Sequence, residues 1–209
     1  MEILVFAPHQ DDEIIGCGGT LLKHKSDGDE VHIAYVTSGP DDPKRRREEA
    51  KNACDVIDAK PHFLNFNGRL VKYDKKHLKK FVEITKNINP DMVYAPHENE
   101  EDHDHKKTSE LVKESSWIAN ESFKQNWGPK KANVKEIRFY EVWTPMKRVD
   151  ISIDITNYMN KKIQALNCYN SQISFTRYDK AIKGLNQYRG IMTNNGTYAE
   201  VFQNKKIRN

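Results

Sequence analysis

A short apolar run, Ile3-Leu4-Val5-Phe6, leads directly into the stretch Ala7-Pro8-His9-Gln10-Asp11-Asp12-Glu13-Ile14-Ile15-Gly16-Cys17-Gly18-Gly19-Thr20. Four consecutive apolar residues are typical of a buried parallel strand. The predicted strand therefore ends at a bend that carries one imidazole and three carboxylates. Such groups repel one another and are costly to desolvate unless a cation neutralises them.

The residue types in this bend suit a divalent metal. A histidine and an aspartate within four residues supply two of the three protein ligands that a catalytic zinc site uses. The neighbouring Asp11 and Asp12 should point in different directions, so one can bind the metal while the other faces its water. The alternative interpretation is an acidic helix N-terminus, which the helix dipole favours.

A second cluster of polar residues follows the apolar segment 92–95. From His97 to His105 it holds three histidines and five acids, in the stretch Pro96-His97-Glu98-Asn99-Glu100-Glu101-Asp102-His103-Asp104-His105. Further strands are expected at 31–36, 62–66, 137–143 and 149–155, and helices at 20–24, 44–57, 74–88, from 108 onward and at 159–166. Gly16, Gly18 and Gly19 are expected to allow close approach of the backbone to the metal or the sheet.

The alternation of strands and helices predicts an α/β fold, a Rossmann-like doubly wound and mainly parallel sheet with helices on both faces. A strand order of about 3-2-1-4-5 places the first and fourth strands side by side at the switch point, where ligands bind at the carboxyl edge. The bends after these two strands would then meet. The two polar clusters are therefore predicted to form one site, although more than ninety residues separate them.

Length and composition exclude several classes of protein. The 209 residues are expected to form a single domain, 1–209, with a sizeable core. No apolar run approaches the roughly 20 residues of a membrane span, and the few apolar residues after Met1-Glu2 are not expected to act as a secretory signal. Three cysteines without a C-x-x-C pair favour reduced thiols in a cytoplasmic protein. The net charge of +4 does not by itself imply a nucleic-acid partner.

The first cluster also resembles the signature of the PIG-L/LmbE family of zinc-dependent N-acetylglucosaminyl deacetylases, A-H-P-D-D-E followed by a glycine-rich turn. This chain has P-H-Q-D-D-E and then I-I-G-C-G-G-T, with Gln10 in place of the usual proline. The resemblance implies metal ligands at His9 and Asp12 and a general base at Asp11. It implies Zn²⁺ as the cofactor, with Fe²⁺ possible because these ligand types do not select decisively between the metals.

Later landmarks of the family follow. T-x-G and R-x-x-E-A match Thr37, Gly39, Arg46, Glu49 and Ala50, which implies substrate binding by Arg46, or by Arg45 or Arg47 if the register shifts. Glu13 is also expected to bind substrate. The C-terminal matches include Asp154 to Thr156, Lys162 to Leu166 and Tyr198 to Phe202, so the resemblance covers nearly the whole chain.

The family motif H-x-D-H aligns with the end of the second cluster. It implies His105 as the third metal ligand, with His103 as the second choice, and catalytic roles for Asp104 and His103. Asp102 stands where the family usually has a histidine that stabilises the oxyanion or protonates the leaving amine. That role would pass to His103 or to His97.

Taken together, the sequence predicts a metal-dependent hydrolase that removes an N-acetyl group from a GlcNAc-type amino sugar and releases acetate. A zinc hydrolase of the same fold acting on another amide or ester is the nearest alternative. A non-enzymatic nucleic-acid-binding module, using the basic segment 44–47 and Trp117, is disfavoured because the acid-rich bends repel phosphate. A dinucleotide-binding domain is disfavoured because Leu21 stands where G-x-G-x-x-G needs its third glycine. Self-association through a sheet edge stays open.

Overall fold

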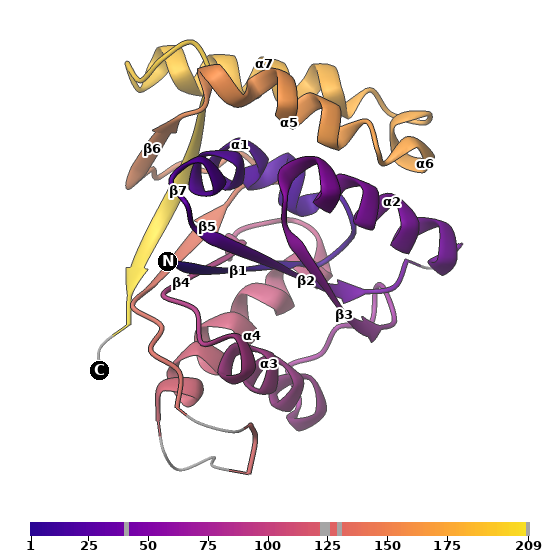
Figure 1. Cartoon of the computed structure of the whole chain (residues 1–209), viewed down its shortest axis with the longest axis vertical. Coiled ribbons are helices and arrows are strands. Elements are labelled where there is room, and N and C mark those ends of the chain that lie inside the picture. The colour runs from indigo at the N-terminus through magenta and orange to yellow at the C-terminus, as the bar shows by residue number, and fades with distance from the viewer. Residues whose placement is uncertain (40–41, 122–125, 129–130, 208–209) are drawn as a thin grey trace.

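The computed structural model describes residues 1–39, 42–121, 126–128 and 131–207 of the chain. Helices pack on both faces of one seven-stranded sheet (Figure 1). The elements in chain order are β1 (Glu2–Ala7), α1 (Asp12–Ser26), β2 (Glu30–Thr37), α2 (Pro43–Ile57), β3 (Lys60–Phe66), α3 (Lys75–Ile88), β4 (Met92–Pro96), α4 (His103–Asn120), β5 (Glu136–Tyr140), β6 (Ile151–Asp154), η1 (Thr156–Tyr158), α5 (Met159–Leu166), α6 (Asn170–Ile173), α7 (Tyr178–Met192) and β7 (Ala199–Lys206).

The strand order is β3-β2-β1-β4-β5-β7-β6, which confirms the predicted order of the first five strands. These five run parallel, whereas β7 pairs antiparallel with both β5 and β6. In β1, Val5 pairs with Ile33 of β2 on one side and with Tyr94 of β4 on the other. The carboxyl ends of β1 and β4 are therefore neighbours, as a shared site at this edge requires.

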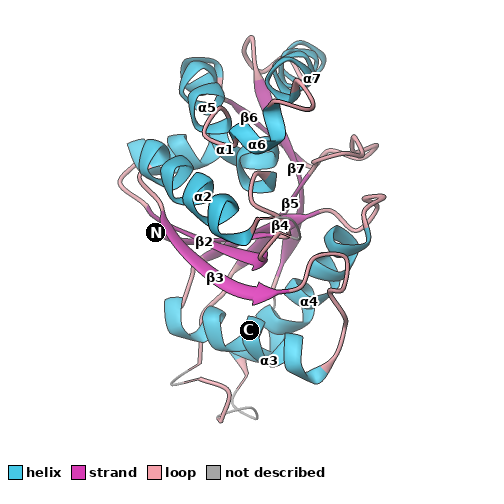
Figure 2. Ribbon diagram, turned by 90° about the vertical axis from the view of Figure 1, so that its right-hand side faces the viewer, coloured by secondary structure: helices cyan, strands magenta, loops and turns pink. Residues whose placement is uncertain are grey.

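The sheet separates two apolar cores because side chains alternate along β1. Ile3, Val5 and Ala7 belong to the core beneath α1, α2, α5 and α7, whereas Leu4 and Phe6 belong to the core on the side of α3 and α4. Figure 2 shows the two helical layers flanking the strands. Among the described residues, no helix is both long and apolar enough to cross a bilayer.

Helix α1 begins at Asp12, and the expected start near Thr20 is wrong. The glycines lie inside this helix. Residues packed against the helix come too close for larger side chains at these positions. A Cβ atom on Gly16 would lie 2.2 Å from Tyr140 Cδ2, and one on Gly19 would lie 2.7 Å from Ile155 Cδ1. These glycines thus allow close packing of α1, and the early start places Asp12 in its first turn.

Helix α4 begins at His103, five residues before the expected start at Thr108. Its N-cap is Asp102, whose side chain accepts hydrogen bonds from the amides of Asp104 and His105. Aspartate is among the preferred N-cap residues because it satisfies amides that have no partner within the helix. His105 therefore occupies a rigid first turn rather than a loop.

Strand β5 ends at Tyr140, three residues before the predicted end at Trp143. Trp143 consequently belongs to the loop that leaves the carboxyl end of β5. This loop runs beside the segment that follows β4, since the amide of His97 donates a hydrogen bond to the Tyr140 carbonyl.

Candidate metal centre

Three potential ligand atoms converge where the loop after β1 meets the first turn of α4. The distances are 3.2 Å from His9 Nδ1 to Asp12 Oδ2, 3.1 Å from Asp12 Oδ2 to His105 Nε2, and 3.3 Å from His9 Nδ1 to His105 Nε2. Tetrahedral coordination with zinc bonds of about 2.0–2.1 Å separates two ligand atoms by about 3.3 Å. The three residues therefore have the chemistry and the spacing of a first coordination shell.

Asp102 also reaches this region, since a carboxylate oxygen of Asp102 lies within 4.8 Å of ligand nitrogens of His9 and His105. Both of its oxygens are engaged, however. One accepts from the Asp104 amide at 2.8 Å, and the other pairs with the Arg69 guanidinium. Asp12 Oδ1, by contrast, is buried and has no hydrogen-bond partner among the described residues. Asp12 is thus the carboxylate with free capacity for a cation.

A carboxylate supports His9 from behind. Asp104 Oδ2 lies 3.3 Å from His9 Nε2, on the opposite side of the ring from Nδ1. Asp104 is fully buried and accepts hydrogen bonds from the backbone amides of Arg69, at 2.6 Å, and Val71, at 3.2 Å. Such a carboxylate fixes the orientation and tautomer of a ligating imidazole. Asp104, expected to be catalytic, therefore positions His9 in this structure.

Glu100 pairs with His105, since its Oε2 lies 3.5 Å from His105 Nδ1. Glu100 is itself fixed by backbone amides of the β5 loop, including those of Val142 at 2.7 Å and Trp143 at 3.2 Å. Hydrogen bonds to the carboxylate and the nearby imidazoles outweigh burial and lower the pKa of Glu100 to about 2. Glu100 thus connects His105 of α4 with the loop after β5.

The charges at the centre reflect this crowding. Although burial opposes it, contacts with Asp104 and Asp12 raise the pKa of His9 to about 10. Despite burial, Asp12 and Glu100 similarly raise the pKa of His105 to about 9. Burial acts against ionisation of Asp12, but the two imidazoles outweigh it and hold the pKa of Asp12 well below its usual range. A carboxylate thus lies between two imidazoles whose pKa values are raised, and a divalent cation can take the place of the protons that they bind.

Asp11 lies beside the three candidate ligands in a strained backbone conformation, with φ of 136°. L-residues rarely adopt such a φ, and strain of this kind concentrates at functional sites. Burial, followed by repulsion from Asp12, raises the pKa of Asp11 to about 8, and the nearby Arg46 partly opposes this rise. Arg46 Nη2 lies 3.5 Å from Asp11 Oδ2. Asp11 is thus a carboxyl group that can take up a proton near neutral pH.

A sequence model described as "PIG-L: GlcNAc-PI de-N-acetylase" matches residues 4–116, which is more than half of the chain and includes every residue of this centre. The chain belongs to the PIG-L family.

The relatives of this chain include one enzyme named a deacetylase and one named a hydratase. Diacetylchitobiose deacetylase of Thermococcus kodakarensis is 25% identical over 191 residues, covering 82% of this chain and 70% of the relative. The 4-oxalmesaconate hydratase of Pseudomonas putida is 24% identical over 196 residues, covering 84% of this chain and 75% of the relative. The structure of N,N'-diacetylchitobiose deacetylase from Pyrococcus horikoshii has the same fold, with a TM-score of 0.86, 23% identity and coverage of 98% of this chain and 83% of that one.

Arg46, which the PIG-L resemblance assigns to substrate, lies against the proposed base rather than reaching into solvent. It is 8% exposed. Its guanidinium donates to the Gln10 carbonyl and, at 3.3 Å, to Ser171 Oγ, and it pairs with Glu49 at 3.4 Å. These contacts join α2 and the start of α6 to the bend after β1.

Glu13 does not line the opening of the centre. Its carboxylate has no exposed surface and accepts hydrogen bonds from Tyr169 at 2.5 Å, Tyr35 at 3.0 Å and the Asp11 amide at 3.2 Å. Burial raises its pKa to about 7, although the tyrosine hydroxyls act in the opposite direction. In this structure Glu13 therefore holds the backbone of the strained Asp11 through its amide. Substrate contact by Glu13 would need a different side-chain position.

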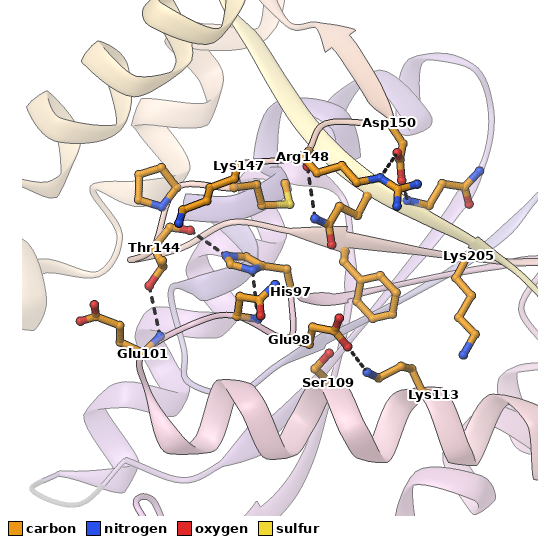
Figure 3. Close-up of a pocket in the computed structure, with 16 residues that line it drawn as sticks. His97, Glu98, Glu101, Ser109, Lys113, Thr144, Lys147, Arg148, Asp150 and Lys205 are labelled. Atoms are coloured by element: carbon orange, nitrogen blue, oxygen red, sulfur yellow. Dashed lines mark hydrogen bonds and ion pairs between the residues drawn. The ribbon is translucent and has the colours of Figure 1, made fainter.

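The two histidines expected to replace the missing family histidine have other partners. His103 is exposed, and its Nε2 lies 3.0 Å from the Val71 carbonyl. His97 is buried, with Nε2 2.7 Å from the Thr144 carbonyl, and faces a separate pocket of about 960 Å³ (Figure 3). None of the three ligand residues lines that pocket. Neither histidine points into the centre formed by His9, Asp12 and His105.

Sequence reasoning did not single out Glu100 and Trp143. Glu100 stood among five acids with nothing to distinguish it, and Trp143 was placed at the end of a strand. The ring of Trp143 lies over that of His105, with centroids 6.5 Å apart and planes inclined by 19°. A strand ending earlier, at Tyr140, would have placed Trp143 at the carboxyl edge where the site was expected.

Proposed function

We propose that this protein is a metal-dependent N-deacetylase that hydrolyses the acetamido group of a GlcNAc-type amino sugar and releases acetate. His9, Asp12 and His105 would hold the metal, and Zn²⁺ is the proposed ion, with Fe²⁺ as an alternative. The observation that carries the proposal is the triangle of ligand atoms, 3.1–3.3 Å on a side, next to a buried Asp12 oxygen without a partner. Membership in the PIG-L family and the name of the Thermococcus relative support the choice of reaction.

A divalent ion bound there would polarise the amide carbonyl and acidify a water molecule. The protein's own contribution begins with Asp11, which would accept a proton from the attacking water. Burial raises the pKa of this carboxyl group, so its carboxylate is a stronger base than that of an exposed aspartate. Arg46, 3.5 Å from Asp11, would orient the carboxylate and favour its ionised form before attack.

The amine must leave as a protonated group, and Asp11 is the proposed donor in this second step. The histidine that the family resemblance assigns to this region is replaced by Asp102, which caps α4 and pairs with Arg69. His103 and His97 have other partners in this structure. A single carboxyl group that first accepts and then returns the proton needs no second acid.

A second candidate is addition of water to a carbon–carbon double bond of an unsaturated acid. Two observations favour it. A hydratase of Pseudomonas putida matches this chain at 24% identity. In addition, Asp102 replaces the family histidine that could donate a proton to a leaving amine. Both reactions begin with proton removal from a water molecule that attacks a planar carbon. They differ in the product, since one yields acetate and an amine and the other a hydroxy acid.

The test loads metal-depleted protein with Zn²⁺ or Fe²⁺ and supplies N-acetylglucosamine, diacetylchitobiose, an N-acetylated peptide and 4-oxalmesaconate in parallel. We expect acetate release from an acetamido sugar and its loss in Asp11→Asn. Asp27→Asn, in the C-cap position of α1, is the matched control and should retain activity. Turnover of the peptide alone or of the unsaturated acid alone would overturn the proposed substrate class.

A further inference from the structure

Trp143 lies beside the metal centre and Tyr178 packs against Trp143, and neither has a role in the chemistry proposed above. Trp143, from the loop after β5, has 40% of its surface exposed. Tyr178 opens helix α7 and is partly exposed, and its ring centroid lies 5.0 Å from that of Trp143, with the planes inclined by 45°. Elements far apart in the chain thus bring a second ring against Trp143, whose own ring lies beside His105.

The backbone that carries the indole is held relative to the candidate metal ligands. The Trp143 amide donates to both oxygens of Glu100, at 3.2 and 3.3 Å, and the same carboxylate lies 3.5 Å from His105 Nδ1. One buried carboxylate therefore holds both the backbone that carries the indole and the imidazole beneath it. The two rings are nearly parallel, at 19°. The backbone of Trp143 therefore cannot move away from the centre without disturbing Glu100, which also pairs with His105.

An exposed aromatic residue is common and by itself indicates nothing. Trp117 is similarly exposed, at 46%, and lies far along α4 from the residues of the centre. Trp143 differs because its apolar surface adjoins charged groups arranged for catalysis and is extended by a second ring. Ligand sites combine aromatic walls with a few polar groups that fix orientation. A pyranose ring matches this arrangement, since its C–H face is apolar and its edge carries hydroxyl groups.

We propose that Trp143 and Tyr178 form the platform on which the pyranose ring of the substrate stacks while its acetamido group reaches His9, Asp12 and His105. This proposal rests on the proposed deacetylase function and adds the residues that select a cyclic sugar over an open-chain amide. Trp143 provides the main surface, and Tyr178 limits the position of the ring from the side of α7.

The experiment compares wild type with Trp143→Ala, Trp143→Phe and Trp117→Ala on two Zn²⁺-loaded reactions, using N-acetylglucosamine as the cyclic substrate and N-acetylethanolamine as the open-chain one. Loss of the stacking surface should raise KM for the sugar about five- to ten-fold in Trp143→Ala and leave kcat/KM for the open-chain amide unchanged. Trp143→Phe should recover most of the affinity, and Trp117→Ala should match wild type. Equal losses on both substrates, or no change on either, would overturn the platform.

Binding measured without turnover separates this proposal from the proposed function. N-acetylglucosamine should change the tryptophan emission of the metal-free wild type, and the change should vanish in Trp143→Phe, which retains Trp117 and Trp127. If the loaded enzyme hydrolyses no acetamido sugar but this emission change occurs, the function fails and the platform stands. If the enzyme is active and the emission change persists in Trp143→Phe, the platform fails and the function stands. Absence of any sugar-dependent change in wild type also overturns the platform.

Discussion

Replacing Lys162 by methionine should destabilise the protein strongly although Lys162 lies outside the metal centre. The ammonium group of Lys162 is fully buried and donates to Glu200 Oε1 at 2.7 Å, to Asn186 Oδ1 at 2.8 Å and to the Ile15 carbonyl at 2.9 Å. These partners belong to β7, α7 and α1. One side chain therefore joins the C-terminal elements to the helix that carries Asp12.

The size of the effect follows from what the substitution leaves behind. Glu200 is 1% exposed and would keep its carboxylate in the core, with the amides of Gly19, at 2.9 Å, and Thr20, at 2.7 Å, as remaining partners. Removing one member of a buried ion pair costs about 3–5 kcal/mol because the other charge stays desolvated. For a chain of this length, that loss corresponds to a decrease in Tm of roughly 6–20 °C.

Urea denaturation followed by circular dichroism measures the free energy of unfolding, with Lys161→Met as the matched control. Lys161 is the exposed neighbour on the same helix, so its replacement should change stability by less than about 0.5 kcal/mol. The double variant Lys162→Met/Glu200→Gln should be more stable than Lys162→Met, because it no longer buries an uncompensated charge. A loss below about 1 kcal/mol in Lys162→Met, or a double variant less stable than the single one, would refute this reasoning.

Three further predictions concern the centre and its support. Asp11→Asn should bind Zn²⁺ as wild type does, which metal analysis measures, while kcat falls about 10²- to 10⁴-fold in an assay of acetate release. Unchanged turnover would contradict the assignment of Asp11 as the base. In the metal-free protein, the pKa values of His9 and His105 are raised from 6.5 to about 10 and about 9, so the folded state binds more protons than the unfolded state. The free energy of unfolding should therefore decrease from pH 7 to pH 10. A rise in the free energy of unfolding over that range would contradict these shifts. Gly16→Ala should cost about 1–3 kcal/mol in thermal unfolding because its Cβ would lie 2.2 Å from Tyr140 Cδ2, and a neutral effect would show that the ring can move away.

The sequence predicted the sheet and the meeting of its two polar bends because both follow from local patterns. Apolar runs marked the parallel strands, and alternation with helices then restricted the order in which they could lie. The resemblance to the PIG-L/LmbE signature then selected His9, Asp12 and His105 from the histidines and acids in these bends. The structure brings these three side chains together as expected.

What the sequence did not predict depends on contacts between distant segments. The start of α1 was placed too late because glycine weakens helices locally, whereas close packing against Tyr140 and Ile155 decides the matter here. The start of α4 was missed because Asp102 was considered a substituted family histidine and not an N-cap. The buried position of Glu13 depends on Tyr169, which lies 156 residues further along the chain. No local pattern reports such a partner.

The most direct test of the central claim is a zinc titration of metal-depleted protein that compares Asp12→Asn with Asp102→Asn. Both carboxylates lie near His9 and His105, but Asp102 is occupied as an N-cap and by Arg69, and asparagine also caps helices well. Wild type and Asp102→Asn should each bind one Zn²⁺ per chain with similar affinity, whereas Asp12→Asn should bind at least about a hundredfold more weakly. Tight, stoichiometric binding by Asp12→Asn, or its loss in Asp102→Asn alone, would contradict the assignment of His9, Asp12 and His105 as the metal ligands.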